Sequence, residues 1–122
     1  RQTKVAMEKN PESLMHEIAK AEGKISGRTS FDAAKQGDKA AQAVVKQYAQ
    51  YVADGIVSVE NVLQPDIISV GGGISREGED LLQPVCEYAA ANGFNKFMPK
   101  TKIVTAQSFN DAGIIGAAMI AK

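Results

Sequence analysis

The sequence predicts an α/β fold in which parallel strands are flanked by helices. A long amphipathic helix is expected from Asp38, a good cap residue, to Leu63, because apolar residues recur there at steps of three and four. Two short runs rich in β-branched residues, 66–70 and 102–106, are each predicted to form a strand, the first one buried. A helical stretch separates them, and this order predicts a parallel pair joined by a crossover helix.

The other predicted elements are helical. Before the long helix, helices are expected at residues 1–8, 11–22 and 31–36, with Asn10 as the cap of the second and a loop at 26–30. After the first strand, Ser75 is expected to cap a helix that runs to about Ala91. The residues predicted to be buried on it are Leu81, Leu82, Val85 and Ala89. A last helix is expected from Asp111 to Ala121, capped by Asn110 or Ser108.

Composition narrows the class of protein. The 122 residues include 14 basic and 14 acidic side chains, for a net charge of zero, and 44% of them are hydrophobic. This is ordinary globular composition, and without a basic stripe we expect no nucleic-acid partner and no anionic membrane partner. The single cysteine, Cys86, suits a reducing compartment. The longest apolar stretch, residues 113–121, is too short to span a bilayer. We therefore expect a cytoplasmic protein.

Two strands make an incomplete sheet. Parallel sheets normally have more than two strands and are covered on both faces, and two strands alone leave edges that pair with other chains. The missing strands must come from residues outside this sequence or from a second copy of the chain. We expect residues 1–37 to be a helical lead-in segment that belongs to an upstream part, and residues 38–122 to form a C-terminal α/β subdomain.

A triple-glycine turn, Gly71-Gly72-Gly73, directly follows the first predicted strand. Glycines allow positive φ angles and close approach of a ligand, and ligands bind at the carboxyl ends of strands in open α/β sheets. The turn is therefore either a nucleotide contact or a tight corner packed against a neighbouring helix. The residue pattern alone leaves both interpretations open.

Two phosphate-binding motifs do not fit the turn. A Walker A loop requires Lys-Ser or Lys-Thr after the glycines, where this sequence has Ile74-Ser75-Arg76. The dinucleotide fingerprint requires a small residue at Arg76 and an acidic residue about 20 positions later, and residues 89–93 contain none. Acidic residues also crowd the expected helix start, namely Glu77, Glu79 and Asp80. They repel phosphate, so a nucleotide bound here would present its uncharged adenosine end to the turn.

Other reactive side chains form no recognisable site. His16-Glu17 begins like a zinc-protease helix, but Lys20 stands where the second histidine is needed. Cys86 has no histidine or second cysteine nearby and is expected to be an inert, partly buried thiol. Tyr48 and Tyr51 are expected to serve in packing. We assign no catalytic residue and no metal ligand to this chain.

Two ordered motifs resemble a known family. The run from Leu63-Gln64-Pro65-Asp66 through Ile67-Ile68-Ser69-Val70 to Gly71-Gly72-Gly73-Ile74-Ser75 resembles the C-terminal part of ROK-family sugar kinases, the group that contains bacterial glucokinases. The closing run Asn110-Asp111-Ala112-Gly113-Ile114-Ile115-Gly116-Ala117-Ala118 resembles that family's final helix.

The resemblance implies the C-terminal portion of an actin-like ATPase (ribonuclease H-like) fold, which binds ATP with Mg²⁺ between two lobes. It implies that the glycine turn lies beside adenosine, with Gly71, Gly72, Gly73, Ile74 and Ser75 as cofactor-binding residues. The phosphate loop, the catalytic aspartate, the sugar-binding residues and a histidine-cysteine zinc site are implied to lie upstream. A homodimer and a role in glycolysis are expected.

Three functional hypotheses follow. The leading hypothesis is the C-terminal part of an ATP-dependent hexose kinase, a glucokinase. The second is a sugar-responsive transcriptional repressor of the same family, in which this region is structural and forms dimers. The third is a scaffold domain that binds no ligand. The upstream sequence would separate the first two, because a repressor carries a helix-turn-helix and a degraded phosphate loop.

Overall fold

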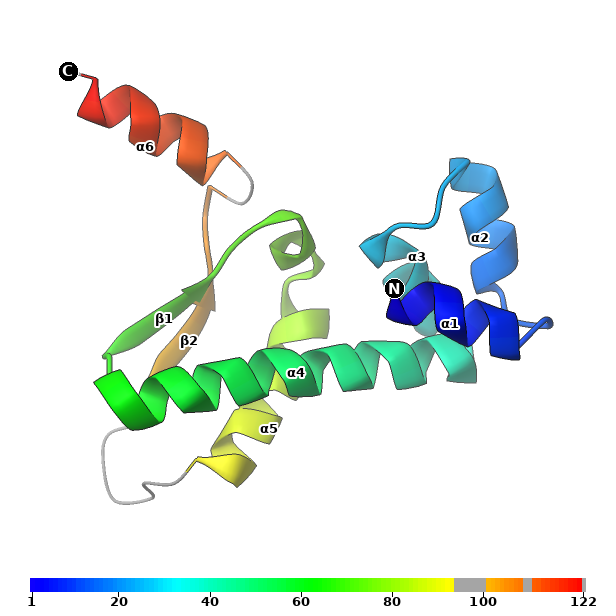
Figure 1. Cartoon of the computed structure of the whole chain (residues 1–122), viewed down its shortest axis with the longest axis horizontal. Coiled ribbons are helices and arrows are strands. Elements are labelled where there is room, and N and C mark those ends of the chain that lie inside the picture. The colour runs from blue at the N-terminus through cyan, green and yellow to red at the C-terminus, as the bar shows by residue number, and fades with distance from the viewer. Residues whose placement is uncertain (94–100, 109–110, 122) are drawn as a thin grey trace. The chain divides into compact units, whose positions relative to one another are not determined.

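The computed structural model describes residues 1–93, 101–108 and 111–121 (Figure 1). Two compact units make up the chain, Arg1–Tyr51 and Val52–Lys122. Helix α4, Lys39–Leu63, has the extent that the periodicity predicted, and its residues belong to both units. Its predicted end is also confirmed, since Gln64 adopts a positive φ of 46° directly before Pro65. The sequence predicts a boundary between residues 37 and 38, with a lead-in segment before it and a subdomain after it. That boundary stays a prediction.

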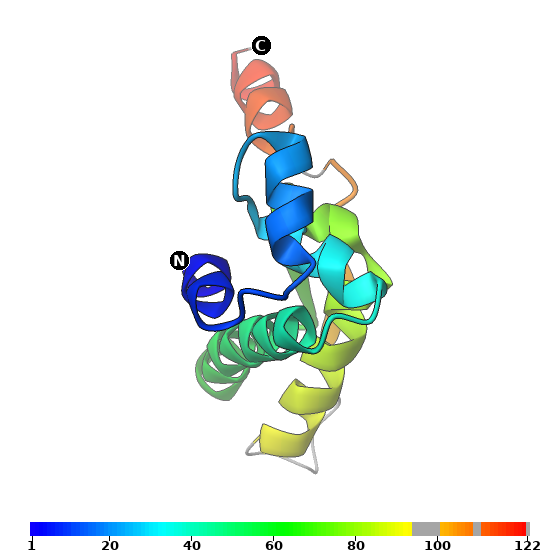
Figure 2. The same cartoon turned by 90° about the vertical axis from the view of Figure 1, so that its right-hand side faces the viewer.

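The first unit is helical. It contains α1 (Gln2–Lys9), α2 (Met15–Glu22) and α3 (Gly27–Lys35), which gather around the first turns of α4 (Figure 2). Its buried core cluster consists of Met7, Met15, Ala33 and Ala41. The ring of Phe31 meets that of Tyr48 edge-on, with centroids 6.3 Å apart. Tyr48 therefore packs as expected, whereas the prediction for Tyr51 was wrong because its side chain is 59% exposed.

Two expectations for this unit were wrong. Residues 27–30, predicted as loop, belong to α3, because Ser26 and Thr29 form a capping box in which the Ser26 N–H donates to Thr29 Oγ1 at 3.0 Å. Asn10 does not begin the second helix. It ends α1 instead, with its Nδ2 donating to the Ala6 carbonyl at 2.7 Å, and α2 begins only at Met15.

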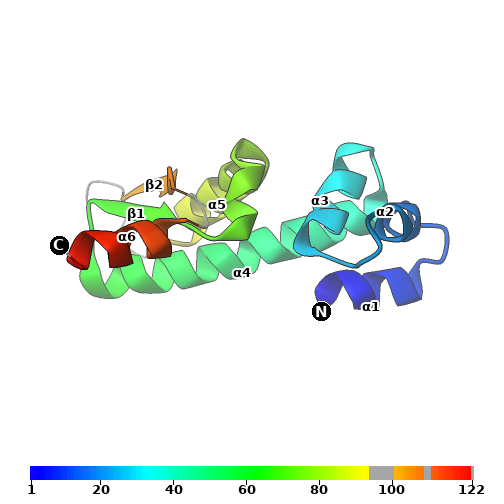
Figure 3. The same ribbon diagram turned by 90° about the horizontal axis from the view of Figure 1, so that it is seen from above.

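The second unit contains the predicted parallel strands. Strand β1 (Ile67–Val70) pairs with β2 (Lys102–Thr105), with Ile67 opposite Lys102 and Val70 opposite Thr105 (Figure 3). Between them come the 3₁₀ helix η1 (Gly73–Glu77) and α5 (Glu79–Asn92), and α5 packs on β2. Helix α6 (Ala112–Ile120) closes the chain. Its predicted cap Ser108 is wrong, since Asp111 holds that position, and the alternative Asn110 lies outside the described residues.

Helix α5 begins later than predicted. Its cap is Gly78 rather than Ser75, because the intervening residues form η1. Leu81, Val85 and Ala89 are buried at four-residue steps, as expected, while Leu82 is only half-buried. The helix contains Pro84 in its interior.

Strand β1 is not buried within this chain, contrary to expectation. Ile67 is 59% exposed, and exposed and half-buried residues alternate along the strand. Two further apolar segments are exposed in the same unit: Val62 and Leu63 at the end of α4, and Ile114, Met119 and Ile120 on α6. A sheet of two strands offers too little surface to cover them. No helix in the described part of the chain is long and apolar enough to cross a membrane.

Candidate functional site

The glycine turn lies where the sequence predicted it, at the carboxyl end of β1. Gly71 directly follows the strand, and the last rung of the ladder is the bond from the Ala106 N–H to the Val70 carbonyl, at 2.9 Å. A Cβ on Gly71 would lie 3.6 Å from the Ala106 Cβ, an ordinary van der Waals distance. Packing therefore does not require glycine at position 71 in this chain.

Gly72 has the conformation that requires glycine. Its φ of 89° and ψ of −178° lie in a region that side-chain-bearing residues rarely adopt. A Cβ added to Gly72 or Gly73 would meet no described atom within 4 Å. Within the described residues, the turn therefore has open space beside these two glycines, and its role stays a prediction. Its outer side has room for a ligand.

Of the five predicted residues, only Ser75 is buried. Ser75 is fully buried, and its Oγ donates a 2.7 Å hydrogen bond to the Gly72 carbonyl. The Ser75 N–H donates to the same oxygen at 3.2 Å. Ile74 is half-buried. Four of the five predicted residues thus present surface at the turn, and the Ser75 side chain points into the protein.

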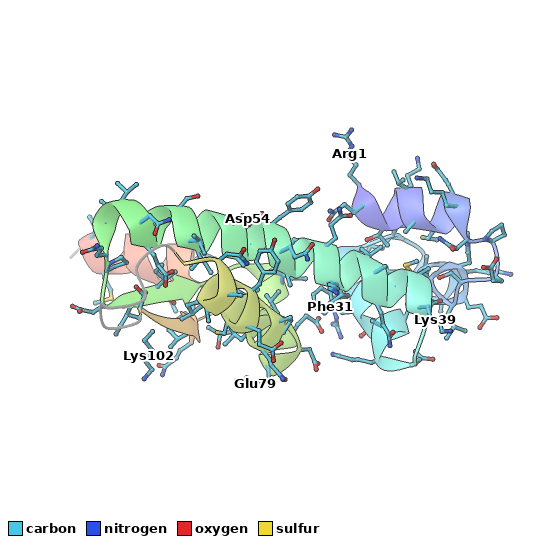
Figure 4. The ribbon with its side chains drawn as sticks, turned by 90° about the horizontal axis from the view of Figure 1, so that it is seen from below. Arg1, Phe31, Lys39, Asp54, Glu79 and Lys102 are labelled. Carbon is cyan, nitrogen blue, oxygen red and sulfur yellow. The ribbon has the colours of Figure 1, made fainter. Side chains whose placement is uncertain are left out.

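Acidic residues follow the turn, but in two separate elements. Glu79 and Asp80 occupy the first turn of α5, and Figure 4 labels Glu79 at its start. Glu77 belongs to η1 and is buried, with an exposed fraction of 8%. The expectation that all three share one helix start was therefore wrong. Carboxylates therefore remain beside the turn, together with the cation of Arg76 in η1, and the carboxylates disfavour phosphate there.

The remaining candidates belong to other helices, His16 to α2 and Cys86 to α5. Nε2 of His16 is 3.1 Å from the Met7 carbonyl oxygen and 3.2 Å from that of Asn10, which gives this exposed residue a local bonding role in the first unit. Cys86 is partly buried, as predicted. Burial raises the pKa of its thiol, and the nearby carboxylates of Glu79 and Glu60 raise it further, so the reactive thiolate is disfavoured.

No metal site forms in the described part of the chain, where no three His, Cys, Asp or Glu side chains come together. We therefore assign no metal ligand to these residues.

Sequence reasoning missed a groove in the first unit. It has a volume of about 820 Å³ and runs between α1 and α4. Its lining is Arg1, Gln2, Val5, Ala6, Lys9, Asn10, Ala40, Ala43, Val44, Gln47 and Tyr51. The apolar positions of α1 were too few to predict it. Val5 and Tyr51 could have signalled it only once α1 was known to lie along α4.

The fold is that of the C-terminal portion of an actin-like ATPase. The crystal structure of a ROK family glucokinase from Streptomyces griseus, in complex with glucose and AMPPNP, superposes with a TM-score of 0.87 at 27% identity. The match covers 98% of this chain and 40% of that one. This confirms the fold class predicted from the two motifs.

The chain belongs to the ROK family, whose profile matches residues 7–122. It is 34% identical over 110 residues to the glucokinase of Thermotoga maritima, covering 90% of this chain and 35% of the relative. It is 32% identical over 100 residues to the glucokinase of Halalkalibacterium halodurans, covering 82% and 30%. The chain thus spans about a third of the length of these relatives.

Proposed function

We propose that this chain is the C-terminal portion of an ATP-dependent hexose kinase that phosphorylates glucose. The polypeptide that carries these 122 residues is called the parent protein below. The observation that carries the proposal is the likeness over 98% of the chain to a glucokinase in complex with glucose and AMPPNP. The glucokinase relatives support it at 32% and 34% identity.

In this proposal the turn forms the adenosine side of the ATP site. Its members are Gly71, Gly72, Gly73, Ile74 and Ser75. The open space outside Gly72 leaves room for a nucleoside, and the acidic start of α5 disfavours the triphosphate at the same place. Other parts of the parent protein would hold the phosphates, the Mg²⁺ that accompanies ATP, the sugar and a structural zinc. They would also supply the aspartate base for transfer of the γ-phosphoryl group to a sugar hydroxyl.

The assembly and location of the parent protein are part of the same proposal. We expect a cytoplasmic homodimer that acts in glycolysis. The exposed apolar residues of β1 and α6 would then be covered by the rest of the parent protein or by the second copy.

Nucleotide titration of the parent protein tests the site. In Gly72→Val a side chain occupies the open space and the residue must hold a φ of 89°. We expect the Kd for ATP to rise about tenfold or more, the loss of roughly 1.4 kcal/mol of binding free energy. The Kd for glucose should be unchanged, because the turn faces the nucleotide.

Gly37→Val is the matched control. Gly37 has nearly the same φ, 88°, and a Cβ there also meets nothing within 4 Å, but the residue lies in the first unit between α3 and α4. A valine at this position must also hold a positive φ, and we expect the Kd for ATP to be unchanged. Equal ATP affinity in Gly72→Val and the unmodified protein would overturn the proposal, as would the absence of ATP-dependent glucose phosphorylation by the parent protein.

A further inference from the structure

We propose that Ser75 is a positioning residue for the nucleotide-facing turn, acting through the Gly72 carbonyl rather than by touching the ligand. This inference rests on the proposed function, because it concerns how the same turn is held.

A run of three glycines has no conformation of its own. Each glycine samples both signs of φ freely, so the free turn would populate many backbone geometries. Gly72 nevertheless adopts one defined conformation, at φ 89° and ψ −178°. Some contact outside the three glycines must select it.

Ser75 provides that contact. Its Oγ donates to the Gly72 carbonyl at 2.7 Å and its N–H donates to the same oxygen at 3.2 Å. The Ser75 side chain is fully buried and Gly72 is half-buried, so the hydroxyl reaches the carbonyl from the inner side of the turn and does not face a ligand outside it. The pair of bonds fixes the plane of the peptide between Gly72 and Gly73 and turns its carbonyl inward.

A second set of bonds connects Ser75 to the core of the unit. The Gly78 N–H donates to the Ser75 carbonyl at 3.2 Å. The N–H groups of Leu81 and Leu82 in turn donate to the Gly78 carbonyl, at 3.2 and 2.9 Å. Leu81 is fully buried, so the turn is held by a chain of bonds that begins in the packed face of α5.

Gly78 also has an unusual backbone conformation, with φ 57° and ψ −126°. Glycines with unusual backbone angles therefore stand on both sides of Ser75, at 72 and 78. Removing the Ser75 hydroxyl leaves only the longer N–H bond on the Gly72 carbonyl. That carbonyl is then held less firmly, and the turn loses part of its preorganisation.

The test compares Ser75→Ala with Ser30→Ala in the parent protein. Ser30 is a close match, since it is 3% exposed and its Oγ donates to the carbonyl of a glycine three residues earlier, Gly27, at 3.1 Å. It lies in α3, in the other unit. A purely structural loss should therefore appear similarly in both variants as a lower Tm.

For Ser75→Ala we expect the Kd for ATP and the KM for ATP to rise about three- to tenfold, the equivalent of one hydrogen bond. We expect kcat at saturating ATP and the KM for glucose to change less than twofold. Amide hydrogen exchange of residues 71–75, followed by mass spectrometry without nucleotide, should be faster than in the unmodified protein. Ser30→Ala should change none of these values.

The outcomes separate this inference from the proposed function. If the unmodified protein binds ATP but Ser75→Ala binds it equally well and exchanges its turn amides at the same rate, the positioning role is wrong. If Ser30→Ala weakens ATP binding as much as Ser75→Ala, the effect is general and the role is again wrong. If Gly72→Val binds ATP normally, the proposed site itself fails.

Discussion

The hydroxyl of Ser13 donates a 2.7 Å hydrogen bond to the carboxylate of Asp38, 25 residues later in the chain. The same carboxylate oxygen accepts the Leu14 N–H at 2.7 Å, and the other oxygen accepts the Ala41 N–H at 2.8 Å. Asp38 therefore caps α4, as the sequence predicted, and also ties the connection between α1 and α2 to that cap. The second role was not predicted, because it depends on a residue far away in the sequence.

Replacing Asp38 with alanine should destabilise the first unit by about 2 kcal/mol. The change removes a helix cap and leaves two donors on residues 13 and 14 without this acceptor. Urea unfolding of the parent protein, followed by a probe in residues 1–51, measures the effect. Asp54→Ala, an exposed position on the same helix, should stay within about 0.5 kcal/mol. Equal midpoints for the two variants would contradict the prediction.

The contribution of Asp38 should depend on pH in the acid range. Partial burial raises the pKa of its carboxyl, but hydrogen bonds from Ala41, Ser13, Leu14 and Ala40 outweigh burial and hold the pKa below its ordinary value. A lowered pKa in the folded state gives stability that is complete above the unfolded pKa, about 3.9, and is lost as pH falls through the folded value. The stability difference between the unmodified protein and Asp38→Ala should therefore be full near neutral pH and shrink below about pH 4. A difference that stays constant down to pH 2 would exclude this role.

Replacing each of two glycines with alanine should change the stability of the protein in opposite directions. Gly55 is exposed in the middle of α4, and a Cβ there meets nothing within 4 Å, so Gly55→Ala should raise stability by about 0.5–1 kcal/mol. Gly23 ends α2 with a φ of 68°, and Gly23→Ala should lower stability by about 1 kcal/mol. Thermal unfolding of the two variants side by side checks the pair. A lower Tm for Gly55→Ala would mean that this position is covered in the parent protein.

The Cys86 thiol should be alkylated slowly near neutral pH. Burial and the charges of Glu79 and Glu60 raise the pKa of its thiol, so little thiolate is present near neutral pH. Iodoacetamide labelling of the Cys86 peptide, followed by mass spectrometry across a pH series, should show a midpoint above that of the urea-unfolded protein. Glu79→Gln should lower this midpoint. Glu87→Gln, on the same helix and bonded to Gln83 at 3.1 Å, should leave it in place.

The length of α4, the parallel strand pair and the position of the glycine turn were predictable from local patterns. Asp38 and Pro65 bound the long helix with short-range chemistry, and β-branched runs mark both strands. The start of α3 was not found, because Ser26 to Ser30 contains the residue types of both a loop and a capping box. Only the bond between Ser26 and Thr29 decides between them.

For the glycine turn, too, some properties were predictable from the sequence and others were not. The sequence by itself determined its place after β1, because glycine content and strand propensity are local properties. Only the tertiary structure decided that Gly72 adopts the glycine-specific conformation, that the Ser75 side chain points inward and that Glu77 is buried apart from Glu79. It also decided that β1 is exposed in this chain. Burial and side-chain direction depend on which distant residues come to lie nearby, and the order of residues along the chain does not specify that locally.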